Sequence, residues 1–163
     1  MKKPPLNVMA GARAVGLLTR SDIDEDTTLF GYHQQAAAAD AVSLTMPIRA
    51  DQYDAMGGLL PIFDMNLPEG QLRERLRLQF AKVIPQFDDL DLLQIVGASQ
   101  IGRLRYSLHD SIDDAVPAQD LAEILTYNGS ADLFTHLLER FATYSGISGV
   151  QPKVLLRAGD APH

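Results

Sequence analysis

The chain has 163 residues, of which 46% are hydrophobic and 21% charged, and its 14 basic and 21 acidic residues give a formal net charge of −7. These values are typical of one soluble domain with its own core, and the acidic balance argues against direct nucleic-acid binding, which needs clustered Lys and Arg. The absence of cysteine excludes disulfides and thiol catalysis. No stretch is apolar enough for a signal peptide or a membrane span, so we expect a cytoplasmic protein.

The amino-terminal third predicts strands separated by turns. Residues 6–18 indicate a hairpin around Gly11, and residues 28–32 indicate a further strand. Between them, residues 21–26 carry three aspartates with the spacing of the first ligands of a calcium loop. The glycine and glutamate that such a loop requires are replaced by Thr27 and His33, so a solvated turn is favoured.

The middle of the chain predicts a mixture of strands and helices. Residues 36–41 are alanine-rich and indicate a short helix or packed turn, and residues 42–46 alternate with period two and predict a strand that ends at Pro47. Further along, we expect a buried connection at 57–68, an amphipathic helix at 72–84, a helix capped by Asp88 or Asp89 and ended by Gly97, and a strand at 101–106.

The carboxyl-terminal third predicts two helices, at residues 119–127 and 130–144, after a polar stretch at 109–117. The order of elements is not a regular βαβ alternation. It therefore predicts an α+β fold, with packed helices on an antiparallel sheet and an internal boundary near residues 110–116.

Candidate catalytic residues are few. The four histidines lie far apart, and no metal-ligand or hydrolase motif is present. Residues 144–156 combine Gly146 and Gly149 with Lys153, and such a loop can bring backbone N–H groups close to phosphate oxygens. Pro152 precedes Lys153, so the loop is no Walker A motif, and the glycines alone are more typical of a helix stop and turn.

Five sequence blocks in consistent order favour the phosphate-binding interpretation of this loop over a helix stop and turn. They are VGLL at 15–18, SLTMPI at 43–48, FDMNLPEG at 63–70 followed by RERL at 73–76, DLLQIVG at 91–97 leading to Ile101-Gly102, and ISGVQPK at 147–153. Together they resemble the HipA family, the serine/threonine protein kinases that serve as toxins in bacterial type II toxin–antitoxin modules.

The resemblance implies three parts. Residues 1–110 would form the small amino-terminal subdomain, residues 111–144 a helical connection, and residues 145–163 the glycine-rich loop and first strands of a kinase core. In the family this loop contributes to ATP binding and carries a regulatory serine. The implied nucleotide-binding residues are Ser148, Gly149, Val150, Gln151 and Lys153. Gly146 replaces the first serine of the family pattern, so Ser148 rather than Ser145 is the expected autophosphorylation site.

The resemblance also implies cofactors and partners. The full-length protein would use ATP and magnesium, whereas the 163 residues lack the catalytic aspartate and the metal-holding aspartate and asparagine of a kinase, so no cofactor is expected for the isolated chain. Expected partners are a cognate helix-turn-helix antitoxin, the remaining kinase core, and a protein substrate such as an aminoacyl-tRNA synthetase. The alternative is a free-standing module that restrains a partner kinase as an antitoxin.

Overall fold

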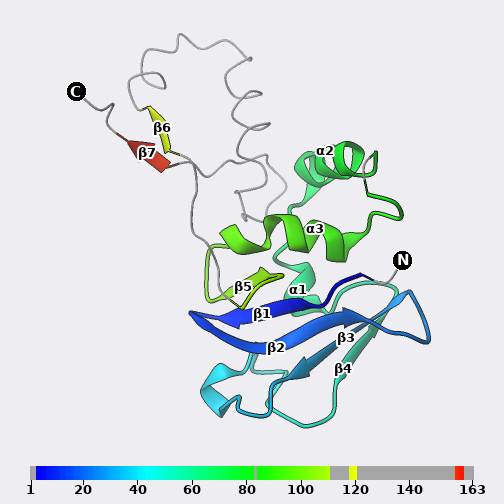
Figure 1. Ribbon diagram of the computed structural model, residues 1–163, viewed down its shortest axis with the longest axis vertical. Coiled ribbons are helices and arrows are strands. Elements are labelled where there is room, and N and C mark those ends of the chain that lie inside the picture. The colour runs from blue at the N-terminus through cyan, green and yellow to red at the C-terminus, as the bar shows by residue number, and fades with distance from the viewer. Residues whose placement is uncertain (1–2, 83, 111–117, 121–156, 160–163) are drawn as a thin grey trace.

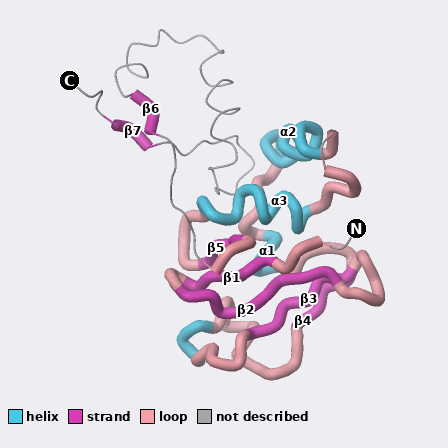
Figure 2. The backbone as a smooth tube through the Cα atoms, viewed as in Figure 1, coloured by secondary structure: helices cyan, strands magenta, loops and turns pink. Residues whose placement is uncertain are grey.

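A computed structural model describes residues 3–82, 84–110, 118–120 and 157–159. Five antiparallel strands form one sheet in the order β4-β3-β2-β1-β5, and helices gather beside β1 and β5 (Figure 1, Figure 2). The predicted α+β fold with an antiparallel sheet is therefore confirmed. The strands are β1 (Leu6–Ala10), β2 (Arg13–Arg20), β3 (Thr27–Tyr32), β4 (Tyr53–Met56) and β5 (Leu104–Ser107).

The predicted hairpin around Gly11 is formed by β1 and β2. Gly11 adopts a φ of 64°, a conformation that glycine tolerates at no steric cost, and its N–H donates to the Arg103 carbonyl at 2.8 Å. The register pairs Leu6 with Leu18 and shifts between Val8 and Met9, so β2 carries an irregularity there. The strand predicted at 28–32 is confirmed as β3, and residues 101–106 contain most of β5.

The helices form close to where the sequence predicts them. The connection at 57–68 contains the single-turn helix α1 (Pro61–Asp64), the amphipathic helix is α2 (Gly70–Phe80), and the capped helix is α3 (Asp89–Val96). Two short 3-10 helices are also present: η1 (Ala38–Asp40) precedes β4, and η2 (Gly97–Ser99) follows α3. Gly97 has a φ of −70°, so glycine is not needed for the backbone angle. It is needed for space, because a Cβ there would lie 2.6 Å from the Tyr106 Cβ.

The strand predicted at residues 42–46 is wrong. Ser43 and Met46 form an isolated bridge across a tight turn, with the Met46 N–H donating to the Ser43 carbonyl at 3.1 Å. The Tyr32 hydroxyl holds both sides of this turn: it accepts from the Val42 N–H at 2.9 Å and donates to the Met46 carbonyl at 2.6 Å. The edge strand of this region is instead β4, which pairs with β3.

Two further strands, β6 (Ala118–Asp120) and β7 (Arg157–Gly159), pair in parallel. Gln119 therefore lies in a strand and not at the start of a helix, which corrects that prediction for residues 119–120. Residues 121–144, where most of the two predicted helices fall, lie outside the described residues.

The core fills the space between the sheet and the helices. Its centre is a run of edge-to-face aromatic contacts: Phe30 lies 5.1 Å from Phe63, and Phe63 lies 5.9 Å from Tyr106, centroid to centroid. Burial raises the pKa of Tyr106, whose hydroxyl accepts a hydrogen bond from Asn66 Nδ2 at 2.9 Å. Among the described helices, none has the length and apolar character required to cross a membrane.

Candidate functional site

The residues predicted to bind nucleotide, Ser148, Gly149, Val150, Gln151 and Lys153, all lie outside the described residues, and so does the regulatory Ser148. The structure therefore leaves the phosphate loop as a prediction. The described domain has a different feature that the sequence did not indicate.

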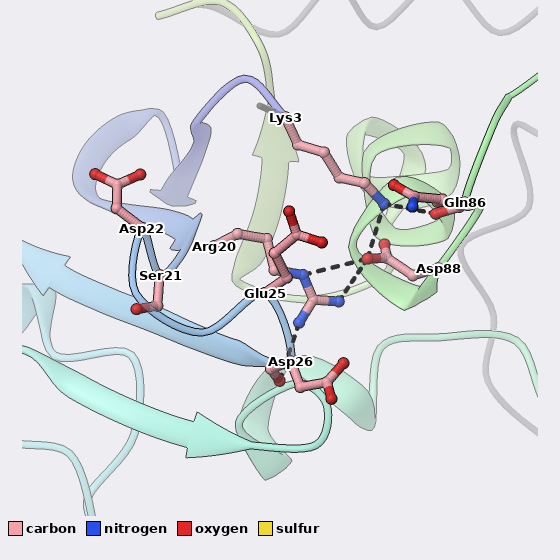
Figure 3. Close-up of a pocket in the computed structure, with 8 residues that line it drawn as sticks. All are labelled: Lys3, Arg20, Ser21, Asp22, Glu25, Asp26, Gln86 and Asp88. Atoms are coloured by element: carbon pink, nitrogen blue, oxygen red, sulfur yellow. Dashed lines mark hydrogen bonds and ion pairs between the residues drawn. The ribbon is translucent and has the colours of Figure 1, made fainter. Parts of the chain in front are cut away.

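That feature is an open polar pocket of about 500 Å³ at one end of the sheet. Three segments meet there: the amino-terminal residues before β1, the turn between β2 and β3, and the connection from α2 to α3 (Figure 3). Two cations and four carboxylates account for six of its lining side chains. The lining residues are Lys3, Arg20, Ser21, Asp22, Glu25, Asp26, Gln86 and Asp88.

Asp88 is the centre of an ion-pair network in this pocket. Its Oδ2 atom lies 2.8 Å from Lys3 Nζ and 2.5 Å from Arg20 Nη2. Its Oδ1 atom accepts from the backbone N–H groups of Leu90 at 2.9 Å and Asp91 at 3.1 Å, which makes Asp88 the N-cap of α3. One carboxylate thus caps a helix with one oxygen and binds two cations with the other.

Lys3 links the amino-terminal segment to residues on both sides of the Asp88 cap. Its ammonium group also lies 2.5 Å from Asp91 Oδ2 and donates to the Gln86 carbonyl at 3.0 Å. Asp91 in turn accepts from the Asp88 N–H at 3.0 Å, which completes a capping box. Gln86 adopts a φ of 53°, so the chain turns sharply just before the cap.

Two opposing effects act on the pKa of Asp88. Burial favours the neutral acid, but hydrogen bonds from Lys3, Arg20 and the Asp91 N–H, together with the Arg20 charge, outweigh burial and lower the pKa. Asp88 is therefore ionised at neutral pH, and the ion pairs persist there.

This lowered pKa predicts a stability that falls in acid. Because the unfolded chain has an ordinary aspartate pKa of about 3.9, it takes up a proton before the folded chain does. The contribution of Asp88 is thus complete well above that value and is lost as the pH falls through it towards the folded-state pKa. Urea unfolding from neutral to acidic pH should show a steeper loss for wild type than for Asp88→Asn. Equal losses in the two proteins would contradict the assignment.

The acidic turn beside the pocket is held by its own side chains. Asp24 Oδ1 accepts from the Asp26 N–H at 3.0 Å, and Asp24 Oδ2 accepts from the Thr27 hydroxyl at 2.7 Å. The Ser21 hydroxyl oxygen accepts from the N–H of Ile23 at 3.2 Å. These are the bonds of a polar turn. Within the described ranges, no group of three or more potential ligands is placed to hold a metal ion.

The two cations that line the pocket are engaged in ion pairs. Lys3 and Arg20 both pair with Asp88. None of the pocket-lining side chains is a histidine or cysteine. The network links the amino-terminal segment and the end of β2 to the first turn of α3.

Sequence reasoning found one of the three members of this network. A cap by Asp88 or Asp89 was predicted from the aspartates that precede an apolar run, and the structure shows that Asp88 is the cap. Lys3 and Arg20 gave no signal, because each lies more than 60 positions from Asp88 in the chain. A sequence pattern of local periodicity carries no information on such a long-range pair.

Comparison with protein families gives a match to one family model, described as the HipA N-terminal domain, over residues 6–107. A search of curated proteins found no match. The matched residues begin at the first residue of β1 and end at the last residue of β5, so the family model covers the whole five-stranded sheet and the helices packed on it. The chain belongs to the HipA N-terminal domain family.

Proposed function

We propose that the chain is the amino-terminal portion of a HipA-like serine/threonine kinase toxin of a toxin–antitoxin module. In this proposal residues 1–110 form a binding domain that contacts the cognate helix-turn-helix antitoxin, and residues 145–153 form the glycine-rich loop that binds ATP with magnesium in the full-length protein. The family match over residues 6–107 carries the proposal.

The described domain supports a binding role for its part of the protein. Its core is closed by residues of the sheet and of all three helices, and its polar pocket is occupied by internal ion pairs. Among the described residues, no group of three or more histidine, aspartate or glutamate side chains is placed to hold a metal ion. Phosphate transfer to a protein such as an aminoacyl-tRNA synthetase would therefore be the work of a kinase core.

The nucleotide loop is the part of the proposal that a pair of variants can test. Gly149→Val adds bulk where phosphates would approach and restricts the backbone, so we expect it to weaken ATP binding by about tenfold or more. Ser148→Ala removes only a hydroxyl, so we expect unchanged ATP affinity and loss of inactivating autophosphorylation. Titration of ATP and magnesium into the folded full-length variants measures the first effect, and phosphopeptide mapping measures the second.

The outcomes separate this proposal from its rivals. Equal ATP dissociation constants for wild type and Gly149→Val would remove the loop from the nucleotide site. Sequencing of the DNA downstream of codon 163 tests the kinase assignment independently, because the proposal requires an in-frame continuation with a catalytic aspartate. A stop codon there, together with inhibition of a separately encoded kinase, would favour the free-standing antitoxin-like module.

A further inference from the structure

Strand β4 lies at one end of the sheet order β4-β3-β2-β1-β5, and the pairing of β3 shows which backbone groups of β4 are open. In an antiparallel sheet, the backbone groups of successive residues point alternately to the two sides of a strand. On β3, the Thr27 carbonyl accepts from the Ser21 N–H at 2.9 Å, so the odd-numbered residues bond towards β2. The even-numbered Thr28 therefore bonds towards β4, where its partner is Ala55.

Two residues of β4 direct their backbone N–H and carbonyl groups away from the sheet. They are Asp54 and Met56, which alternate with Ala55. The Gly57 N–H, just after the strand, donates to the Asp26 carbonyl at 3.0 Å, as this alternation requires. Within the described part of the chain, these outward groups have no hydrogen-bond partner. The Asp54 side chain is exposed and that of Met56 is 83% exposed, so we call the outward groups of these two residues the β4 edge.

The loop before β4 limits the β4 edge and holds the start of the strand. The Gln52 carbonyl, which lies one step before the edge, accepts from Arg49 Nη2 at 2.8 Å. Arg49 Cζ lies 3.6 Å from the centroid of the Tyr53 ring, and the Tyr53 hydroxyl donates to the Pro47 carbonyl at 2.7 Å. The open residues therefore follow a strand start that is already fixed, which reduces the ordering cost of binding at the edge.

The surroundings of the β4 edge are acidic. The turn at residues 21–26, which reaches the end of β4 through the Gly57 bond, carries four carboxylates and neither Lys nor Arg. Residues 51–56 carry two further carboxylates and again neither Lys nor Arg. A charge on an edge strand discourages pairing with unselected strands, so Asp54 makes the edge selective for a segment of opposite charge.

We propose that the β4 edge binds an extended basic segment of a partner protein, which adds to the sheet as a further strand. Main-chain hydrogen bonds to Asp54 and Met56 hold the segment, with a Lys or Arg side chain opposite Asp54 and an apolar side chain opposite Met56. The acidic turn adds an attraction that weakens with salt. A second copy of the chain is the weaker occupant, because each copy brings the same carboxylates and a net charge of −7.

A cyclic β-hairpin peptide tests this proposal with the 163-residue chain. One strand of the peptide alternates lysine and valine, and the other alternates glutamate and threonine, so the basic strand is already extended and the peptide has little net charge. Amide hydrogen exchange is measured by NMR without and with saturating peptide. We expect the N–H groups of Asp54 and Met56 to exchange fast in the free chain and about tenfold more slowly in the complex, whereas the Ala55 N–H, which bonds to β3, changes little.

Matched variants of the peptide and of the protein identify the bonds. N-methylation of the outward amides on the lysine strand should weaken binding about tenfold, and the same change on the glutamate strand should not. Met56→Pro removes an outward N–H that Met56→Ala keeps, so the proline variant alone should lose about fivefold in affinity. Asp54→Lys should lose about fivefold through charge. Circular dichroism verifies the sheet, and the N-methylated peptides test the same bonds on wild type if Met56→Pro does not fold.

Three results would overturn the proposal. Slow exchange of the Asp54 and Met56 amides in the free monomer would show that the edge is already covered. Absence of binding, or equal affinity for the two N-methylated peptides, would show that the edge does not accept a strand. Protection of the same amides on dimerisation without peptide would assign the edge to self-association. These readouts need neither ATP nor a kinase, so their failure would leave the proposed function untouched.

Discussion

Replacing Gly16 with alanine is expected to destabilise the folded chain by about 3 kcal/mol or more. Gly16 lies on β2, and a Cβ at this position would collide with the Gly31 carbonyl oxygen and approach the Phe30 ring to 2.7 Å. The carbonyl belongs to the neighbouring strand and cannot move without breaking the β2–β3 pairing, in which Gly16 pairs with Tyr32. Urea unfolding at neutral pH measures the loss in free energy of unfolding.

Gly58→Ala is the matched control for this prediction. A Cβ at Gly58 has no atom within 4 Å, and Gly58 is not among the residues with a positive φ. We expect this variant to be neutral, or slightly more stable because alanine restricts the unfolded chain. Equal losses in the two variants would show that flexibility, and not the close approach of two strands, explains the glycine at position 16.

Asp88→Ala is expected to cost about 3 kcal/mol, because it removes two contributions at once. Loss of the N-cap costs about 1 kcal/mol. The remainder comes mainly from Arg20, whose side chain is only 15% exposed and would lose its ion pair with Asp88, whereas Lys3 would keep its ion pair with Asp91 at 2.5 Å. The partial exposure of the network keeps this second part to about 2 kcal/mol, below the cost for a fully buried pair.

Asp88→Asn separates the two contributions. Asparagine is an equally good N-cap, so this variant keeps the bonds to the start of α3 but loses the charge. We expect its loss in stability to be about 1 kcal/mol smaller than that of Asp88→Ala. A double-mutant cycle with Arg20→Met then measures the ion pair itself, and a coupling energy near zero would contradict the network.

The predictions from sequence succeeded where one segment fixes its own structure. The hairpin around Gly11 and the cap of α3 both depend on residues a few positions apart, and both are confirmed. Residues 42–46 failed because Ser43 and Thr45, which imitate strand alternation, bond locally instead: the Ser43 hydroxyl accepts from the Thr45 N–H at 3.2 Å. The Tyr32 hydroxyl then bonds to both sides of the turn. The alternation of residues 42–46 gives no information about this contact with a residue outside the segment.

The candidate site was harder to predict than the fold for the same physical reason. Lys3, Arg20 and Asp88 are each an ordinary charged residue in its own sequence context, and only the folded chain brings the three together. Gly97 is similar, since its sequence position suggests a helix stop but the structure requires it for contact with Tyr106.

The strand order has a consequence for how the chain folds during synthesis. Strands β1 to β4 form a meander of sequence neighbours, but β1 receives its other partner, β5, only from residues 104–107. Local hairpins can close early, whereas this last pairing carries the loop-closure cost of almost the whole domain. Until the ribosome has released residue 107, β1 has one open edge. That nascent edge is a point at which the polypeptide is exposed to pairing with another chain.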